Sequence, residues 1–169
     1  MKVAVLGPES SGKTSLTEDL SRHFHWDRVQ EFSRTYLTEL NRPYDEHDLF
    51  VIAKRQFEEI HVLGSERSFI SDSELLTIKI WAMEKYGSCD GRIVDLLRRQ
   101  KFDLYLLCYP DLKWAQDALR ESPDLNDRLR QYHLFKSELE SMKVDYSVVK
   151  GAGKDRLNCA LSIITKRLE

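Results

Sequence analysis

The sequence predicts a three-layer α/β/α domain built on a parallel sheet, and three observations carry this prediction. Short apolar runs alternate along the chain with helical patterns, which is typical of parallel strands joined by crossover helices. A glycine-rich phosphate-binding motif follows the first apolar run. Apolar residues make up 41% and charged residues 32% of the 169 residues, which indicates a globular chain and not a disordered one.

Five short apolar runs are expected to form the strands. The run at 104–108 is the clearest, because Asp103 and Pro110 bound it. Right-handed crossovers place the carboxyl ends of all parallel strands at one edge of the sheet, where ligands bind. The expected strands are residues 3–6, 27–30, 68–71, 104–108 and 146–149.

The segments between these runs carry helical periodicity or the signals of helix ends. Residues 45–63 are the clearest amphipathic helix, with Asp45 as the expected N-cap and Gly64 as the C-terminal stop. Asn126 is the expected N-cap of a polar helix. Residues 31–40 are expected to form a short helix or a loop. The other expected helices cover residues 15–24, 75–86, 93–100, 126–142 and 154–168.

Length and charge limit the classes of function. The length fits one domain, 1–169, and the sequence contains no repeat, low-complexity stretch or linker. The net charge of −2 provides no overall basic field that would favour nucleic acid. No apolar run reaches the roughly 18 residues of a membrane span, and no signal-peptide pattern opens the chain. We therefore expect a cytoplasmic protein whose partners are small molecules, with no membrane and no nucleic acid.

The phosphate-binding motif is complete and lies in the context that it needs. Residues 7–14 read Gly-Pro-Glu-Ser-Ser-Gly-Lys-Thr, which matches G-x-x-x-x-G-K-[ST] between an expected strand and an expected helix. The glycines let backbone N–H groups turn toward phosphate oxygens, and the helix N-terminus adds partial positive charge. The motif predicts a P-loop NTPase fold that binds a nucleoside triphosphate. The expected nucleotide contacts are Gly7, Pro8, Glu9, Ser10, Ser11, Gly12, Lys13, Thr14 and Ser15.

Two residues of this motif and one acid at the end of a strand predict a site for Mg²⁺. Lys13 is placed to bridge the β- and γ-phosphates, and the Thr14 hydroxyl can ligate the metal. Asp72 ends the strand expected at 68–71, where a phosphate-loop enzyme needs a second metal-holding group. An aspartate at such a position is also a common turn former or helix cap, but the motif upstream favours the metal role.

Three further polar residues follow strands at the same edge. Glu74 either faces a substrate or lies in the first turn of a helix, where its charge suits the helix dipole. Glu31 and Arg34 follow the second strand, where a carboxylate can bind a sugar diol or take a proton from an attacking hydroxyl. Arg34 can complement a phosphate or that carboxylate. The alternative is an exposed surface ion pair, and the spacing leaves both interpretations open.

The segment 111–130 is charged and follows the fourth expected strand. Phosphoryl-transfer enzymes have a mobile lid at this place, which brings arginines onto the transferring phosphate. We expect a lid here, with Arg120 as the main candidate among its arginines. The alternative is a solvated pair of helices.

The aromatic residues are less decisive. Trp81 has apolar neighbours and is expected in the core. Tyr36, Tyr44 and Trp114 lie in polar settings near the expected cleft, where any of them can stack on a flat ring. The sequence does not distinguish among these three.

Taken together, these segments resemble the ribosylnicotinamide kinase domain of NadR-type NAD-biosynthesis proteins and their stand-alone AAA-type ATP-binding relatives. The resemblance covers nearly the whole chain. Its most specific parts are the Glu-Ser-Ser-Gly-Lys form of the loop at 9–13 and the block formed by Trp114, Asp117 and Leu119-Arg120. The other matching segments are 30–34, 72–81 and 103–111.

The resemblance implies an adenylate-kinase-like fold with a short lid. It also implies transfer of the ATP γ-phosphate to the 5′-hydroxyl of nicotinamide riboside. Carried onto this chain, it assigns ATP and Mg²⁺ to Lys13 and Thr14, the metal or base role to Asp72, the nucleoside pocket to Glu31 and Arg34, and the lid to Arg120.

The chain departs from the family at one point of the expected site. The family commonly has Asp-Thr-Asp where this chain has Asp72-Ser73-Glu74, so the second acid is longer by one methylene and its role is open. We expect a kinase in which Lys13, Mg²⁺ and Arg120 neutralise the transferring phosphoryl group. Either Asp72 or Glu31 would deprotonate the acceptor hydroxyl. The alternatives are another nucleoside, nucleotide or metabolite as the acceptor, or a regulatory P-loop ATPase.

Overall fold

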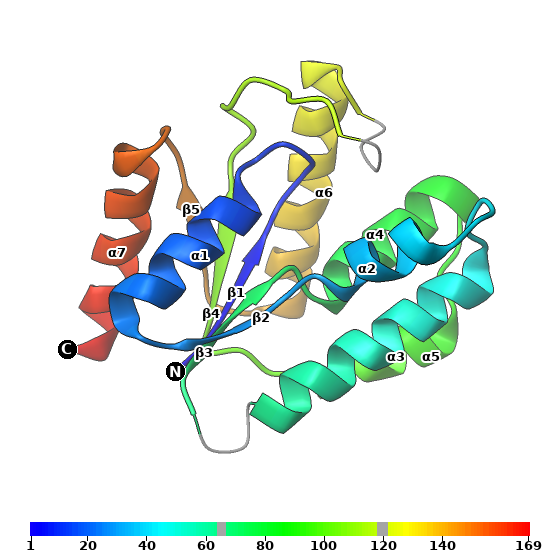
Figure 1. The fold of residues 1–169 in the computed structure, drawn as a ribbon, viewed down its shortest axis with the longest axis horizontal. Helices are drawn as coiled ribbons and strands as arrows, with labels where there is room; N and C mark the ends of the chain where they lie inside the picture. The colour runs from blue at the N-terminus through cyan, green and yellow to red at the C-terminus, as the bar shows by residue number, and fades with distance from the viewer. Residues whose placement is uncertain (64–66, 118–121) are drawn as a thin grey trace.

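All five strands of the sheet are parallel (Figure 1), in the order β2-β3-β1-β4-β5. The computed structural model describes residues 1–63, 67–117 and 122–169. Each predicted strand is confirmed to within one residue at either end. The strands are β1 (Lys2–Leu6), β2 (Asp27–Val29), β3 (Phe69–Asp72), β4 (Leu104–Cys108) and β5 (Tyr146–Val149).

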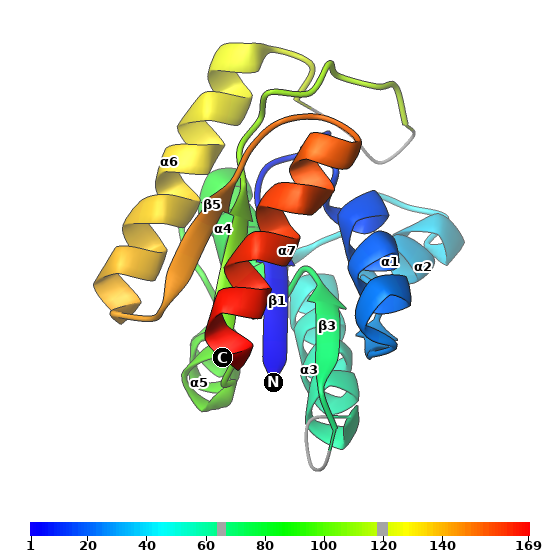
Figure 2. The same cartoon turned by 90° about the vertical axis from the view of Figure 1, so that its left-hand side faces the viewer.

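Helices cover both faces of this sheet, which confirms the predicted three layers. Helices α1 (Lys13–Phe24) and α7 (Lys154–Leu168) cover the face turned toward the viewer in Figure 2. The opposite face packs against α3 (Glu46–Leu63), α4 (Leu75–Tyr86), α5 (Gly91–Arg99) and α6 (Leu125–Met142), and α2 (Phe32–Glu39) packs on α3. Among the described helices, none combines the length and the apolar character that crossing a membrane requires.

Strand β1 shows why the sequence divides its apolar residues between two cores. Its side chains alternate across the sheet, so Val3 and Val5 join the core under α1 and α7. Ala4 and Leu6 join the core on the other face. All four side chains are fully buried, which explains a continuous apolar run in place of an alternating pattern.

Of the two predicted N-caps, the structure confirms the one at Asp45 and contradicts the one at Asn126. Asp45 caps α3 as predicted: its carboxylate accepts from the Asp48 backbone N–H (3.0 Å), and the Asp48 carboxylate accepts from the Asp45 N–H (2.8 Å). The predicted cap at Asn126 was wrong. Asp124 caps α6 instead and accepts from the backbone N–H of Asn126 (2.6 Å), so the helix begins earlier. The predicted stop at Gly64 lies outside the described residues.

Helix α4 begins on a buried carboxylate. Glu74 is 1% exposed, and its side chain accepts hydrogen bonds from the Leu76 backbone N–H (2.8 Å) and from the Gln100 amide. Ser73, just before it, has a φ of 68°, which turns the chain sharply from β3 into the helix. Desolvation by burial raises the pKa of Glu74 from 4.5 to about 7.

We predict that Glu74 makes the stability of the protein fall between about pH 4.5 and 7. The folded state holds the Glu74 proton more tightly than the unfolded chain does, so the free energy of unfolding decreases as the pH rises through this window. In Glu74→Gln the side-chain oxygen can still accept both hydrogen bonds, and this part of the pH dependence should disappear. Urea denaturation at several pH values measures it, with the exposed Glu39→Gln as the control. An unchanged pH slope in Glu74→Gln would contradict the prediction.

Candidate active site

The turn between β1 and α1 forms the phosphate-binding loop, and its geometry explains the two glycines. Gly7 has a φ of 142°, and a Cβ there would lie 2.7 Å from the carbonyl oxygen of Cys108. Gly12 has a φ of 74° and occupies the N-cap of α1. The Ser11 hydroxyl is buried and donates to the carbonyl of Pro8 (2.7 Å), which holds the turn closed. The loop therefore presents the N-terminus of α1 to the carboxyl edge of the sheet.

Lys13, Thr14 and Asp72 come together beside this loop, as predicted. The Lys13 ammonium donates to the carbonyls of Gly7 and Pro8 (both 3.0 Å). Asp72 ends β3 and is 2% exposed. Burial raises the pKa of Asp72, while the charge of Lys13 and a hydrogen bond from Thr14 oppose that rise. The carboxylate thus lies near a cation and a hydroxyl.

The surroundings of the Asp72 carboxylate suit a Mg²⁺ ion. Its Oδ1 atom is buried and makes no hydrogen bond within the described part of the chain. A hard divalent cation prefers oxygen ligands, and Asp72 and Thr14 supply a carboxylate and a hydroxyl side by side. These two residues could therefore hold the metal together with phosphate oxygens of a bound nucleotide.

Glu31 follows β2 and lies at the N-cap of α2, but its side chain does not cap that helix. Its carboxylate accepts from the Ser33 hydroxyl (3.0 Å), and the Arg34 guanidinium lies 4.0 Å away. Burial raises the pKa of Glu31, the charge of Lys13 lowers it, and the charge of Asp72 raises it. The side chain is 15% exposed, so the interpretation as an exposed surface pair is wrong for this carboxylate.

The segment after β4 crosses the phosphate-binding loop (Figure 1), and polar contacts hold it there. The Ala115 backbone N–H donates to the Ser10 hydroxyl (3.2 Å), and the Ser122 N–H donates to the Glu9 carboxylate (2.9 Å). Asp117 pairs with Arg34 at 3.0 Å. The described residues between 111 and 124 contain no helix, and Arg120 lies outside the described residues. The lid therefore remains a prediction.

Two cavities adjoin these groups. The first, of ≈ 130 Å³, is lined by residues 9–15 together with Glu31, Ser33, Arg34, Leu37 and Trp81. The second, of ≈ 370 Å³, shares Glu9, Leu37 and Trp81 with the first, so the two are neighbours along one cleft. The remaining lining of the second cavity is Tyr44, Glu84, Lys85, Ser122, Asp127, Arg130 and Gln131.

Trp81 differs from its prediction. It is only half-buried: it packs against the core and also lines both cavities of the cleft. Its apolar neighbours in α4 gave no signal of this second role. Of the three aromatic residues that the sequence left open, Tyr44 lines the second cavity, whereas the Tyr36 hydroxyl donates to Asp48 (2.8 Å). Neither of the two cavities is lined by Trp114.

Glu74 lies deeper than the cleft. It lines neither of the two cavities but a much smaller one, of ≈ 10 Å³, that Glu31, Ser33 and Trp81 also line. Ser73 Oγ, Glu74 Oε1 and Thr77 Oγ1 border this space, and each is buried without a hydrogen-bond partner in the described structure. Of the two positions predicted for Glu74, the structure places it at the start of a helix.

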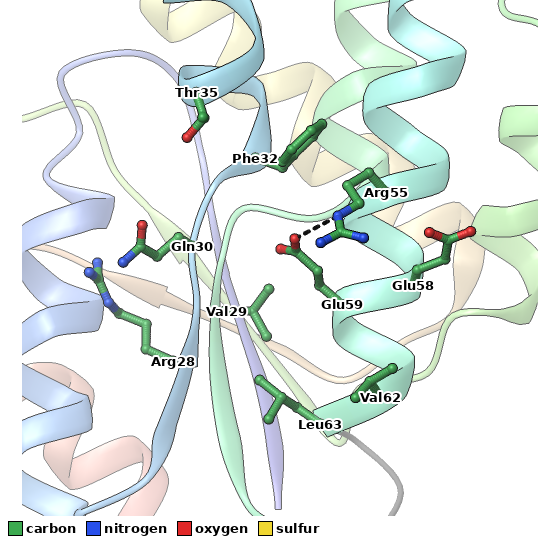
Figure 3. A pocket seen from close by; sticks show the side chains of 10 residues that line it. All are labelled: Arg28, Val29, Gln30, Phe32, Thr35, Arg55, Glu58, Glu59, Val62 and Leu63. Atoms are coloured by element: carbon green, nitrogen blue, oxygen red, sulfur yellow. Dashed lines mark hydrogen bonds and ion pairs between the residues drawn. The ribbon is translucent and has the colours of Figure 1, made fainter.

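Another cavity, of ≈ 530 Å³, lies on the outer side of β2 and α2 (Figure 3). It holds none of the residues that the sequence singled out for the site. Its lining comes from β2, the turn after it, α2 and α3: Arg28, Val29, Gln30, Phe32, Thr35, Arg55, Glu58, Glu59, Val62 and Leu63. Size alone therefore does not identify the candidate site in this molecule.

Comparisons with known proteins relate this chain to NadR proteins and to other kinases. The chain is 25% identical to the trifunctional NAD biosynthesis/regulator protein NadR of Salmonella typhimurium over 159 residues. This alignment covers 90% of the chain and 39% of the relative, so the chain spans well under half of that protein. A crystal structure of NadR protein in complex with NR superposes with a TM-score of 0.80 at 16% identity. It covers 98% of this chain and 50% of that one.

The fold is shared more widely. Deoxyadenosine kinase from M. mycoides matches with a TM-score of 0.67 at 14% identity, over 98% of this chain and 100% of that one. The fold is therefore that of P-loop nucleoside and nucleotide kinases. A family model described as an AAA domain (AAA_28) matches residues 2–156, and the chain belongs to this family.

Proposed function

We propose that the protein is an ATP-dependent kinase that phosphorylates the 5′-hydroxyl of nicotinamide riboside to give nicotinamide mononucleotide. The observation that carries this proposal is the convergence of Lys13, Asp72 and Glu31 beside the phosphate-binding loop, at the head of a cleft. The NadR relatives support the choice of acceptor, and the shared kinase fold supports the reaction class.

In this proposal the loop and its lysine hold the triphosphate of ATP. Backbone N–H groups of residues 9–14 bind the phosphates, and Lys13 exchanges its contacts with Gly7 and Pro8 for phosphate oxygens. Thr14 and Asp72 would hold Mg²⁺, which neutralises phosphate charge when it is bound. Arg120 in the lid stays a prediction for the same electrostatic task.

Glu31 is the proposed base, which leaves Asp72 to the metal. Glu31 lines the cleft and its side chain does not cap α2, whereas Asp72 lies near Lys13 and Thr14 and lines neither cavity of the cleft. A carboxylate whose pKa is raised by burial is a better proton acceptor near neutral pH. The acceptor oxygen forms its bond to the γ-phosphorus while the bond from that phosphorus to the bridging oxygen breaks, ADP leaves, and the hydroxyl proton passes to Glu31.

The ≈ 370 Å³ cavity next to the loop is the proposed place for the acceptor. Its aromatic residues suit the flat cationic ring of nicotinamide riboside, since a cation over an aromatic face is attracted to it. Lys85 already lies 3.2 Å from the centre of the Tyr44 ring. We therefore assign the ring contact to Trp81. Arg34, between Glu31 and Asp117, would approach the transferred phosphate.

The first prediction for this function is acceptor-dependent turnover. With ATP, Mg²⁺ and nicotinamide riboside, the protein should form ADP and nicotinamide mononucleotide. Mass spectrometry detects both products. Lys13→Ala should lower the rate at least about a hundredfold, because the phosphate charge loses its partner. Lys54→Ala, which replaces an exposed lysine on α3, serves as the control.

Turnover of a different nucleoside, with none of nicotinamide riboside, would favour the second candidate, a kinase like its deoxyadenosine kinase neighbour. ATP hydrolysis that ignores every acceptor would contradict the kinase proposal and favour a regulatory ATPase.

A second prediction separates the two carboxylates. Glu31→Gln should lower kcat by about 10²–10⁴-fold and leave the Mg²⁺ concentration for half-maximal activity unchanged, because it removes a proton acceptor. Asp72→Asn should raise that Mg²⁺ concentration, because it removes a metal-holding charge. Titration of Mg²⁺ against initial rate measures both. The reverse pattern would exchange the two assignments.

A further inference from the structure

Gln56 connects α3 to the turn that carries Glu31. Its side chain is 3% exposed and makes two hydrogen bonds, one to each flank of that residue. The amide oxygen accepts from the Phe32 backbone N–H at 2.9 Å, and the amide nitrogen donates to the Gln30 carbonyl at 3.1 Å. One planar group thus holds the peptide units before and after Glu31.

The turn around Glu31 joins the end of a strand to the start of a helix. Strand β2 ends at Val29 and lies at the edge of the sheet, and α2 begins at Phe32, so Glu31 lies between the two elements. Its carbonyl accepts the Arg34 backbone N–H (3.2 Å) at the start of α2. The first N–H groups of a helix need partners from outside it, and the Glu31 side chain supplies none. Gln56 satisfies the first of these groups from a neighbouring helix.

A second contact from α3 reaches the same turn. The Arg55 guanidinium lies over the Phe32 ring, 6.0 Å from its centre, and Figure 3 shows this ring pointing toward α3. Arg55 is itself held by Glu59 at 3.0 Å. The turn is therefore fixed from α3 through both its backbone and a side chain, while the Glu31 carboxylate lines the cavity at the phosphate-binding loop.

We propose that Gln56 is a positioning residue for phosphoryl transfer: it holds the Glu31 carboxylate at the acceptor hydroxyl without touching the substrate itself. The proposal rests on the proposed function in one respect, the role of Glu31 as base. Proton transfer depends on geometry, and a displacement of about 1 Å can cost up to a hundredfold in rate. A loosened turn should therefore lower kcat and leave ATP binding intact.

Three substitutions test this role. Gln56→Met removes both hydrogen bonds and keeps a side chain of similar length. Gln56→Glu keeps an acceptor for the Phe32 N–H and loses the donor to the Gln30 carbonyl. Its kcat should therefore lie between those of the wild type and Gln56→Met. Ile60→Val lies one turn further along the same buried face of α3 and lines neither cavity of the cleft, so it controls for a loss of packing.

We expect Gln56→Met to lower kcat about tenfold, with the Kd for ATP unchanged and with faster hydrogen exchange at the Phe32 amide. In a Glu31→Gln background the same substitution should have almost no further effect on kcat, because the group that it positions is gone. The order of kcat should be wild type, then Gln56→Glu, then Gln56→Met. Ile60→Val should leave both kcat and the Phe32 exchange near the wild-type values.

Other outcomes overturn the proposal. If Gln56→Met lowers kcat by the same factor in the Glu31→Gln background as in the wild type, Gln56 does not act through Glu31. If Ile60→Val lowers kcat as much as Gln56→Met does, the loss comes from packing and not from positioning. Failure of the proposed function is recognised separately, since the wild type would then turn over no acceptor. In that case slow ATP hydrolysis by water and the Phe32 exchange remain as readouts. Unchanged values of both in Gln56→Met would refute the positioning role.

Discussion

The parallel pairing of β1 with β3 is the constraint on which the candidate site depends. In this register Val5 lies opposite Asp72, and the Ser73 backbone N–H donates to the Val5 carbonyl at 2.9 Å. The phosphate-binding loop begins two residues after Val5, so the pairing brings Asp72 to the side of that loop. A slip of one residue would turn Asp72 to the opposite face of the sheet. The buried side chains on both faces of β1 prevent such a slip.

Three largely buried carboxyl groups lie at the same edge of the sheet, and ionising them there lowers the stability of the folded protein. Burial raises the pKa of Glu31, Asp72 and Glu74, so each resists ionisation at this edge. Lys13 lowers the pKa of the first two, but Lys13 is not among the groups that act on Glu74. Perturbed acids gathered in a cleft are typical of functional sites. Glu31 and Asp72 thus share the influence of Lys13, whereas Glu74 accepts hydrogen bonds at the start of α4.

The sequence predicted the parts of the molecule that depend on neighbours along the chain. The strands have local apolar runs, the loop has its motif, and Asp72 and Glu31 follow strands whose ends must meet in a parallel sheet. The parts that it missed depend on packing between distant segments. Trp81 and Gln56 lie on helices whose sequences give no sign of these contacts, and only the tertiary fold brings them to the cleft and to the Glu31 turn. The cap of α6 was misplaced because Asp124 and Asn126 are equally good caps by type.

Arg34 shows how the cleft and the segment above it are coupled. Its guanidinium lies 4.0 Å from Glu31 and 3.0 Å from Asp117, so it joins the end of β2 to the segment that crosses the phosphate-binding loop. Ser10 and Glu9 of the loop accept the backbone N–H groups of Ala115 and Ser122. The guanidinium has five N–H donors, so Arg34 can contact a phosphate at the loop and still keep Glu31 or Asp117. Arg34 therefore connects the turn that carries Glu31 to Asp117, in the described segment after β4, through two ion pairs.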